Sequence, residues 1–308
     1  AGVANTVMGT ANRVSDSNGA LVYGAGNEIT NSRARIDNLN AENVASAKEF
    51  ANKLRESIIS SNGGGATMAI GGGNKADNTR STAIIGVNNS VVGVDVSSKN
   101  NFVAGTNNKL KDVNNSVIIG VGDKDYVTNG LNNIVSIGTN AKVTADNSVA
   151  LGSNSVANSA VATASTNING RTYNFAGAAP VATVSVGDSN KERTITNVAA
   201  GRISSTSTDA INGSQLHSVI QEMNSVASDT LTKVNHYTDM QINKVGAASA
   251  ALAALHPLEF NKDYKWQFAT GFGNYGNKTA VALGAFYQPN ENILLSLGTT
   301  LGGHNNMV

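Results

Sequence analysis

The residue types that most often carry catalysis are few and scattered in this chain of 308 residues. It has no cysteine, and its four histidines are His217, His236, His256 and His304. None of them has a second ligand at the spacing of a zinc site, and no Ser–His–Asp or Cys–His set can be assembled. His256 precedes Pro257, an arrangement typical of the end of a helix. We therefore expect no enzymatic activity, no cofactor and no bound metal.

Three loops resemble ligand-binding motifs only in part. Residues 71–75 read Gly-Gly-Gly-Asn-Lys, but the Gly-Lys-Ser/Thr of a phosphate-binding loop is missing. Residues 123–125 (Asp-Lys-Asp) and 188–190 (Asp-Ser-Asn) begin like calcium loops but lack the later Gly and Glu. We interpret all three as turns.

Composition excludes several classes of function. The net charge is +1 and only 14% of residues are charged, so no basic excess favours nucleic acid as a partner. No run of about eighteen apolar residues is present, which argues against a membrane-spanning helix. The 32 glycines and the frequent asparagines suit a β architecture with many turns, because both residues tolerate left-handed backbone. Ala1 already lies inside a repeat, so we expect a processed or truncated N-terminus.

Residues 1 to about 160 form an array of short repeats. Each unit has Asn, a small residue, a β-branched run and then Gly, and the units end at Gly9, Gly24, Gly71, Gly86, Gly105, Gly120, Gly138 and Gly152. Apart from one long gap, neighbouring units are 14 to 19 residues apart. Such a unit holds two brief strands and cannot bury its apolar side alone. The array therefore predicts a solenoid whose stacked coils share one apolar core.

The long gap in the array predicts a helix, over residues 37–60. Its apolar stripe is Val44, Ala47, Ala51, Leu54 and Ile58. Insertions in repeat proteins often carry the binding surface, and this one places Phe50 among the cations Lys48, Lys53 and Arg55. We predict a receptor contact at these four residues. Two alternatives stay open: the helix packs on the solenoid or seals an oligomer, or the sides of the coils bind instead.

A heptad pattern follows near residue 216. Its seam is Leu216, Ile220, Met223, Ala227, Thr230, Val234 and Tyr237, alternately four and three residues apart. This spacing predicts a coiled-coil helix, with Asp209 as its N-cap. An alanine-rich segment over residues 247–255 leads from the helix to the C-terminal strands.

The C-terminal region has the alternation of a membrane-spanning β-barrel. Three segments carry large residues on one face: Trp266, Phe268, Thr270 and Phe272; Val281, Leu283, Ala285 and Tyr287; Ile293, Leu295, Leu297, Thr299 and Leu301. The opposite faces are small: Ala269, Gly271 and Gly273; Ala280, Ala282 and Gly284; Ser296, Gly298 and Thr300.

Three such strands cannot close a barrel, and open edges are not tolerated in hydrocarbon. Closure by antiparallel pairing between copies requires an even number of strands per chain, so we expect a fourth strand after residues 306–308. Two copies would give eight strands, whose interior side chains fill, whereas three copies give twelve and leave room for helices. Gly271, Gly284 and Gly298 would then clear space for those helices, or alternatively relieve strand curvature.

Two stretches resemble the neck of the trimeric autotransporter adhesins, the YadA-like family. Residues 193–201 read Arg-Thr-Ile-Thr-Asn-Val-Ala-Ala-Gly and residues 208–216 read Thr-Asp-Ala-Ile-Asn-Gly-Ser-Gln-Leu. The positions that carry the neck motif are Thr196, Asn197, Val198, Ala199, Ala200, Gly201, Asp209, Gln215 and Leu216. The Asn-Ser-Val-x-x-Gly coils resemble the family's head, and residues 255–258 (Leu-His-Pro-Leu) with the strands resemble its anchor.

The resemblance implies a mainly β fold with a coiled coil. Its parts would be a trimeric left-handed parallel β-roll head over residues 1–190, with a helical insertion at about 33–60, and a neck over 191–215. A three-stranded coiled-coil stalk over 216–246 and a 12-stranded trimeric transmembrane β-barrel anchor over 247–308 would follow, truncated before the fourth strand.

The resemblance also implies a function. The chain would be an adhesin of the bacterial outer membrane and cell surface, exported by type V secretion through its own barrel, with the lumen glycines Gly271, Gly284 and Gly298 letting the passenger through. Its partners would be two further copies and a host receptor or matrix protein: collagen, fibronectin, laminin or carcinoembryonic-antigen-related adhesion molecules. Alternatives are a solenoid enzyme, such as a hexapeptide acyltransferase or polysaccharide lyase, and an outer-membrane pore; residues 1–200 contain no histidine that would favour the enzyme.

Overall fold

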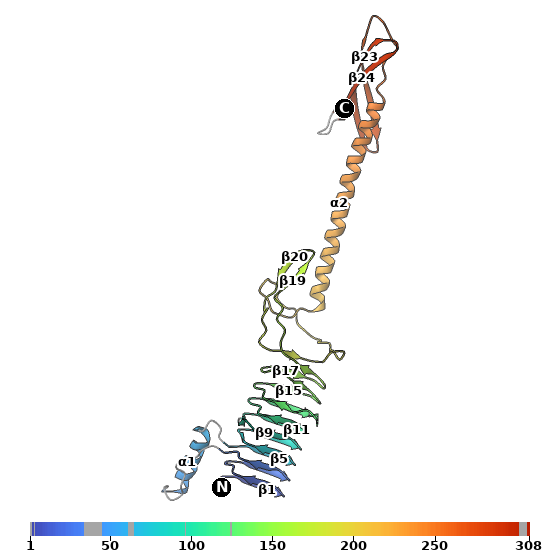
Figure 1. The fold of residues 1–308 in the computed structure, drawn as a ribbon. Coiled ribbons are helices and arrows are strands. Elements are labelled where there is room, and N and C mark those ends of the chain that lie inside the picture. The colour runs from blue at the N-terminus through green and yellow to red at the C-terminus, as the bar shows by residue number, and fades with distance from the viewer. Residues whose placement is uncertain are drawn as a thin grey trace. The chain divides into compact units, whose positions relative to one another are not determined.

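The computed structural model describes residues 2, 4–33, 45–60, 65–95, 97–123, 125–301 and 307–308, with the backbone alone for 57–60. The chain divides into two compact units. One comprises Ala1–Val198 with Arg202–Ala210, and the other comprises Ala199–Gly201 with Ile211–Val308. The first unit is built from stacked coils, and the second from a long helix and three strands (Figure 1).

The coils of the first unit form two long parallel sheets. The first sheet joins β1 (Thr6–Thr10), β3 (Leu21–Ala25), β5 (Met68–Gly72), β8 (Ala83–Val87), β11 (Phe102–Thr106), β13 (Val117–Val121), β15 (Val135–Ile137), β17 (Val149–Leu151) and β21 (Val184–Ser185). The second joins β2 (Arg13–Ser15), β4 (Glu28–Thr30), β6 (Lys75–Asp77), β9 (Ser90–Val92), β12 (Lys109–Lys111) and β14 (Thr128–Asn129). Shorter parallel pairs are β7 (Thr79–Arg80) with β10 (Ser98–Lys99), and β16 (Lys142–Val143) with β18 (Val156–Ala157). The predicted β-solenoid is confirmed.

The core of the solenoid is one column of small and β-branched side chains. In β3, β8 and β11 the second residue of the strand points inward: Val22, Ile84 and Val103, all fully buried. The second sheet contributes Ile29 and Val91 to the same column. Residues of one strand alternate between the two faces of a sheet, so the neighbours of these core residues point outward. Burying the core in this way stabilises the stack at roughly 25 cal/mol per Å² of apolar surface.

An asparagine ladder satisfies the polar groups at the corner between the two sheets. The Nδ2 of Asn74 donates to Oδ1 of Asn27 at 2.9 Å and to the carbonyl of Gly86 at 2.8 Å. Asn89 repeats the pattern one coil later, donating to Asn74 and to Gly105. Buried polar groups are costly unless they are paired. This explains why Asn recurs three residues after the glycine of a repeat, as at Asn27, Asn74 and Asn89.

Of the helix predicted over residues 37–60, the structure describes residues 45–60, and the helix occupies 47–60 of these. Helix α1 covers Ala47–Ser60. The beginning of the predicted range, 37–44 with Val44, lies outside the described residues, and only the backbone of Ile58 is described. Glu49 accepts the backbone N–H of Ala45 at 2.9 Å, which anchors the first turn.

The solenoid array is interrupted a second time, between β18 and β21, and the sequence analysis missed the strands found there. Strands β19 (Ser165–Ile168) and β20 (Arg171–Asn174) form an antiparallel hairpin whose residues are all exposed. The turn between them is Asn169-Gly170, and both residues have positive φ. Asn-Gly is the preferred pair for a tight hairpin turn, which is the signal that was available in the sequence.

The second unit is one long helix and an antiparallel sheet. Helix α2 runs without a break from Gly213 to Ala253, so the heptad segment and the alanine-rich segment are one element. Its N-cap is Asn212 in a capping box with Gln215, and the expectation that Asp209 caps the helix is wrong. The strands are β22 (Trp266–Tyr275), β23 (Lys278–Asn290) and β24 (Ile293–Leu301), paired in that order.

Candidate functional site and assembly surfaces

Gly201 and Gln215 of the neck motif meet at the start of α2. The amide of Gln215 closes a local network: its Oε1 accepts the backbone N–H of Gly201 at 3.0 Å and that of Asn212 at 3.2 Å. Its Nε2 donates to the carbonyl of Gly201 at 2.7 Å. One side chain therefore fixes the end of the Thr-Asn-Val-Ala-Ala-Gly segment against the first turn of the helix. Asn197, in the same segment, has φ of 60°, a left-handed conformation that asparagine tolerates.

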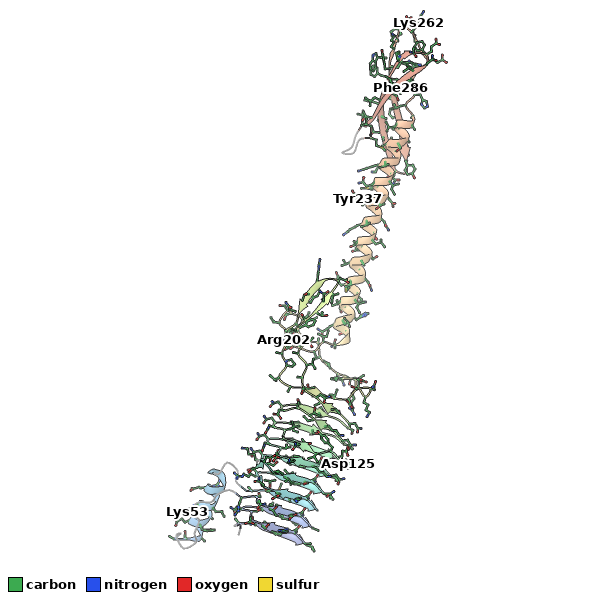
Figure 2. All side chains as sticks on the ribbon, in the orientation of Figure 1. Lys53, Asp125, Arg202, Tyr237, Lys262 and Phe286 are labelled. Atoms are coloured by element: carbon green, nitrogen blue, oxygen red, sulfur yellow. The ribbon has the colours of Figure 1, made fainter. Side chains whose placement is uncertain are left out.

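Asp209 serves an ion pair and not a helix cap. Its carboxylate accepts from Nε of Arg202 at 2.8 Å and from Nη2 at 3.0 Å, and also from the Arg202 backbone N–H. The Arg202 guanidinium holds the pKa of the Asp209 carboxyl below its usual value. The pair fastens the loop between the two parts of the neck motif; Figure 2 labels Arg202 there.

Arg193 is a neck residue whose partners the sequence analysis missed. Its Nη1 donates to Oγ of Ser155 at 3.1 Å, and its Nη2 donates to the carbonyl of Ser153 at 2.6 Å. Both acceptors belong to the last coils of the solenoid, about forty residues earlier in the chain. The guanidinium thus links the neck segment to the last coils of the solenoid. The local sequence does not predict this contact, because it does not determine the direction of the Arg193 side chain.

The apolar seam of α2 has no cover within one chain. Leu216, Met223 and Val234 are all more than half exposed, and so is Tyr237, which Figure 2 labels on the helix. An isolated amphipathic helix is marginal in water, because its stability depends on burying the apolar face. The seam therefore requires partner helices, as the heptad pattern indicates.

The last turns of α2 pack on the small face of the three-stranded sheet. Ala247 and Ala251 are buried there. A Cβ added at Gly271 would lie 2.1 Å from the carbonyl oxygen of Ala251, and one added at Gly273 would lie 2.2 Å from the Ala251 backbone nitrogen. Glycine is required at both positions for the helix to approach this closely. Gly273 is an addition to the three glycines singled out in the sequence.

Gly284 and Gly298 border side chains of the same helix end and not its backbone. A Cβ at Gly284 would lie 3.0 Å from Cδ1 of Leu255, and one at Gly298 would lie 2.8 Å from the same atom. Phe286 interrupts the otherwise small face and is buried beside them; Figure 2 labels it on the sheet. The role of these glycines in export stays a prediction.

The opposite face of the sheet is apolar and open. The register pairs Trp266 with Tyr287 and Phe268 with Ala285, so the large residues of all three strands share one face, as predicted. The exposed fraction of the Phe268 side chain is 80% and that of Phe272 is 69%. The rings of Trp266 and Tyr287 are 4.8 Å apart near one end of the strands. Water does not stabilise such a face, but lipid does.

In the described part of the chain, no helix combines the length and apolarity that crossing a membrane requires.

The solenoid also carries an uncovered apolar face. The outward positions of the first sheet hold Tyr23, Phe102, Ile119 and Leu151, all exposed. Neighbours above and below in the stack are likewise apolar, because Leu21 pairs with Met68 and Phe102 pairs with both Ala83 and Val117. A continuous apolar face of this kind marks a protein–protein interface.

The four residues of the predicted receptor contact lie on two faces of α1. At 3.6 residues per turn, Lys48 and Arg55 share one face, and Phe50 and Lys53 lie on the other. Nζ of Lys53, labelled in Figure 2, is 3.0 Å from the Glu49 carboxylate, which lowers the pKa of Glu49. Phe50 and Lys53 are half-buried and Lys48 and Arg55 are exposed. The structure therefore does not gather the four into one cluster.

Within the described ranges, no three or more His, Cys, Asp or Glu side chains converge so that they could hold a metal ion. Residues 188–190 take part in a short bridge between Asp188 and Lys191, which is a turn. His256 Nδ1 lies 3.0 Å from the carbonyl of Ala254, at the end of α2.

Comparison with known proteins matches segments of the head, the stalk and the anchor to one family. Two copies of the YadA head domain repeat match residues 63–84 and 135–155, the coiled stalk of trimeric autotransporter adhesins matches 194–239, and the YadA-like membrane anchor domain matches 259–308. The autotransporter adhesin BtaE of Brucella suis is 65% identical over 68 residues, which are 22% of this chain and 9% of that protein.

The C-terminal YadA-like domain of BPSL2063 from Burkholderia pseudomallei is a solved structure with 38% identity, covering 44% of this chain and 53% of that one with a TM-score of 0.32. The chain spans less than a tenth of the BtaE sequence and about half of the solved domain. The head, stalk and anchor together define a surface protein of the autotransporter class. The chain belongs to the family of trimeric autotransporter adhesins, and it resides at the bacterial outer membrane and cell surface.

Proposed function

We propose that three copies of this chain assemble into an adhesin that binds a host-cell receptor or a matrix protein. The observation that carries the proposal is that the first sheet of the solenoid, the seam of α2 and the strands of the anchor each leave an apolar face or strand edge open. Threefold association covers all of them with one symmetric set of contacts.

In the anchor, each copy supplies a share of one barrel. Strands β22 and β24 are the outer strands of the three-stranded sheet, and in hydrocarbon their free edges would cost several kcal/mol for every unpaired group. A fourth strand after β24 would allow antiparallel closure between copies, giving twelve strands around three helices. The backbone contact of Gly271 with Ala251 supports a lumen that the helices fill, which favours an anchor over an open pore.

In the stalk and the head, the three copies would run parallel. The α2 seams would form a three-stranded coiled coil, and the apolar faces of the three solenoids would meet at the axis. Three identical heads on one fibre raise avidity without adding contacts. The ligand class proposed is collagen, fibronectin, laminin or a carcinoembryonic-antigen-related adhesion molecule, bound through α1 or the sides of the coils.

The barrel would also export its own passenger by type V secretion. The small face around Gly284 and Gly298 supports this, because hairpins must pass before the helices settle in the lumen. Cells that display the chain should adhere to at least one of these immobilised ligands, and cells that display only the neck, stalk and anchor should not. Equal adhesion by the two kinds of cell would show that the head does not bind the ligand.

A further inference from the structure

The outer face of the second sheet differs from that of the first. Its outward positions are polar or charged in almost every coil, and the register stacks Arg13 on Glu28, Glu28 on Lys75, and Lys75 on Ser90. Lys109 follows Ser90 in the next coil. The adjacent pair of short strands stacks Arg80 directly on Lys99.

Cations outnumber carboxylates in these coils. Residues 68–116 contain Lys75, Arg80, Lys99, Lys109 and Lys111, but only Asp77, Asp95 and Asp112 as acidic residues. Neighbouring strands of a sheet are about 4.8 Å apart, so the five cations occupy three successive rungs within about 10 Å along the stack. We call these five residues the basic ladder.

Two carboxylates next to the ladder, those of Asp77 and Glu28, are engaged elsewhere. Asp77 accepts from Oγ1 of Thr30 at 2.8 Å and from Nδ2 of Asn31 at 2.7 Å. Glu28, in the coil before the ladder, pairs with Arg13 at 3.0 Å. These acids link neighbouring coils, since the partners of Asp77 and Glu28 lie one coil earlier, and their charges are turned away from the ladder.

Asp112 is likewise committed to the backbone. It is buried and accepts the N–H groups of Val94 at 2.6 Å and Asp95 at 3.1 Å, with Nζ of Lys111 at 4.0 Å. Among the residues that the structure describes, Lys75, Arg80 and Lys99 have no carboxylate within ion-pair distance. These three side chains are therefore available to an anionic ligand.

We propose that the basic ladder binds a linear anionic polysaccharide. One or two cations on each successive rung present a row of charge to a polymer that carries a carboxylate or sulfate in every repeat. The outward positions of the second sheet contain no aromatic residue, whereas sites for single-stranded nucleic acid combine cations with stacking rings. The ladder lies on the second sheet and on the β7–β10 pair, whereas the apolar face lies on the first sheet.

This inference rests on the proposed function only in placing the head at the host surface, where such polysaccharides occur. The test uses cells that display the full chain and measures binding of fluorescent heparin, hyaluronan and uncharged dextran. We expect heparin to bind most, hyaluronan less and dextran not at all. Binding should weaken as salt rises, since screening shortens electrostatic reach to about 8 Å at 0.15 M.

The decisive variant is Lys75→Gln with Arg80→Gln and Lys99→Gln, which should lower heparin affinity by about tenfold, because three surface ion contacts are lost. The matched control removes three exposed charges outside the coils: Arg171→Gln, Lys191→Gln and Lys233→Gln. It should bind heparin like the parent.

Heparin binding that is absent in the parent, or equal in both variants, would refute the proposal that the basic ladder binds a polysaccharide. Single-stranded DNA competing as well as heparin, with the same dependence on the three cations, would overturn the choice of polysaccharide. Adhesion of the same cells to matrix proteins is measured in parallel. Loss of polysaccharide binding is thereby distinguished from loss of the proposed adhesin function.

Discussion

At the scale of single residues, the glycine at the fourth position of each five-residue strand in the first sheet is required by the close approach of the neighbouring coil. Gly105 has φ of +132°, and a Cβ there would lie 1.8 Å from the carbonyl oxygen of Gly120. The same approach recurs at Gly71 and Gly86. Stacking at the distance of a parallel sheet leaves no room for a side chain at this corner, which is why the repeat keeps glycine.

Gly105→Ala should therefore destabilise the head. We expect a loss of roughly 3 kcal/mol in the free energy of unfolding, from backbone strain and the collision together. The control is Gly130→Ala, at a glycine that also has positive φ but has no atom within 4 Å of an added Cβ; it should cost only about 1 kcal/mol. Denaturant unfolding followed by circular dichroism measures both, and equal losses would contradict the close approach.

Asp209 gives a prediction for pH. Because its pKa in the folded chain is lowered by Arg202, the ion pair contributes stability above the unfolded pKa of about 3.9 and loses it as pH falls through the folded value. The NMR chemical shift of the Asp209 carboxyl carbon should titrate with a midpoint below the unfolded pKa, and Arg202→Gln should raise that midpoint. A midpoint that does not respond to this substitution would show that another group stabilises the carboxylate.

At the scale of elements, α1 presents two faces that can be tested separately. Lys48→Ala with Arg55→Ala removes the exposed basic face, and Phe50→Ala with Lys53→Ala changes the opposite face. If the helix is the receptor contact, one pair should reduce adhesion to the host ligand several-fold and the other should have little effect. Deleting residues 33–60 should remove that adhesion. Full binding by a folded trimer that lacks the segment would refute the contact.

Substitutions at two glycines of the anchor distinguish a role in helix packing from a role in export. Gly271→Leu should weaken the trimer, since its side chain would meet the backbone of α2. Gly284→Leu meets only the side chains of Leu255 and Phe286, which can shift, so the trimer should survive heating nearly as well as the parent. Surface display should nevertheless fall, because the lumen is narrower during export. Loss of display and of trimer stability in equal measure at Gly284 would contradict this role.

Periodicity explains which elements could be predicted from the sequence. Alternation placed the two faces of β22, β23 and β24 correctly, and the glycine spacing defined the coils. The cap of α2 was misplaced because Asp209 and Asn212 are both good capping residues, although Gln215, three residues after Asn212, completes a capping box only for Asn212. The partners of Arg193 and the close approach of α2 to Gly273 depend on segments far apart in the chain, which local patterns do not encode.

At the scale of the whole molecule, one chain buries its solenoid core but leaves its interfaces open. The seam of α2 and the outer face of the anchor sheet are the clearest examples, with Met223 and Phe268 both mostly exposed. Apolar area of this extent is stable only against a partner or lipid. We therefore expect each chain to be one third of a fibre with a shared membrane plug.

The mass of the assembly tests this most directly. The protein is extracted from outer membranes in mild detergent, and its mass is measured by sedimentation with the detergent contribution subtracted. We expect three times the mass of the denatured chain, with the spectroscopic signal of the anchor β-strands retained. A folded particle with the mass of a single chain would contradict it.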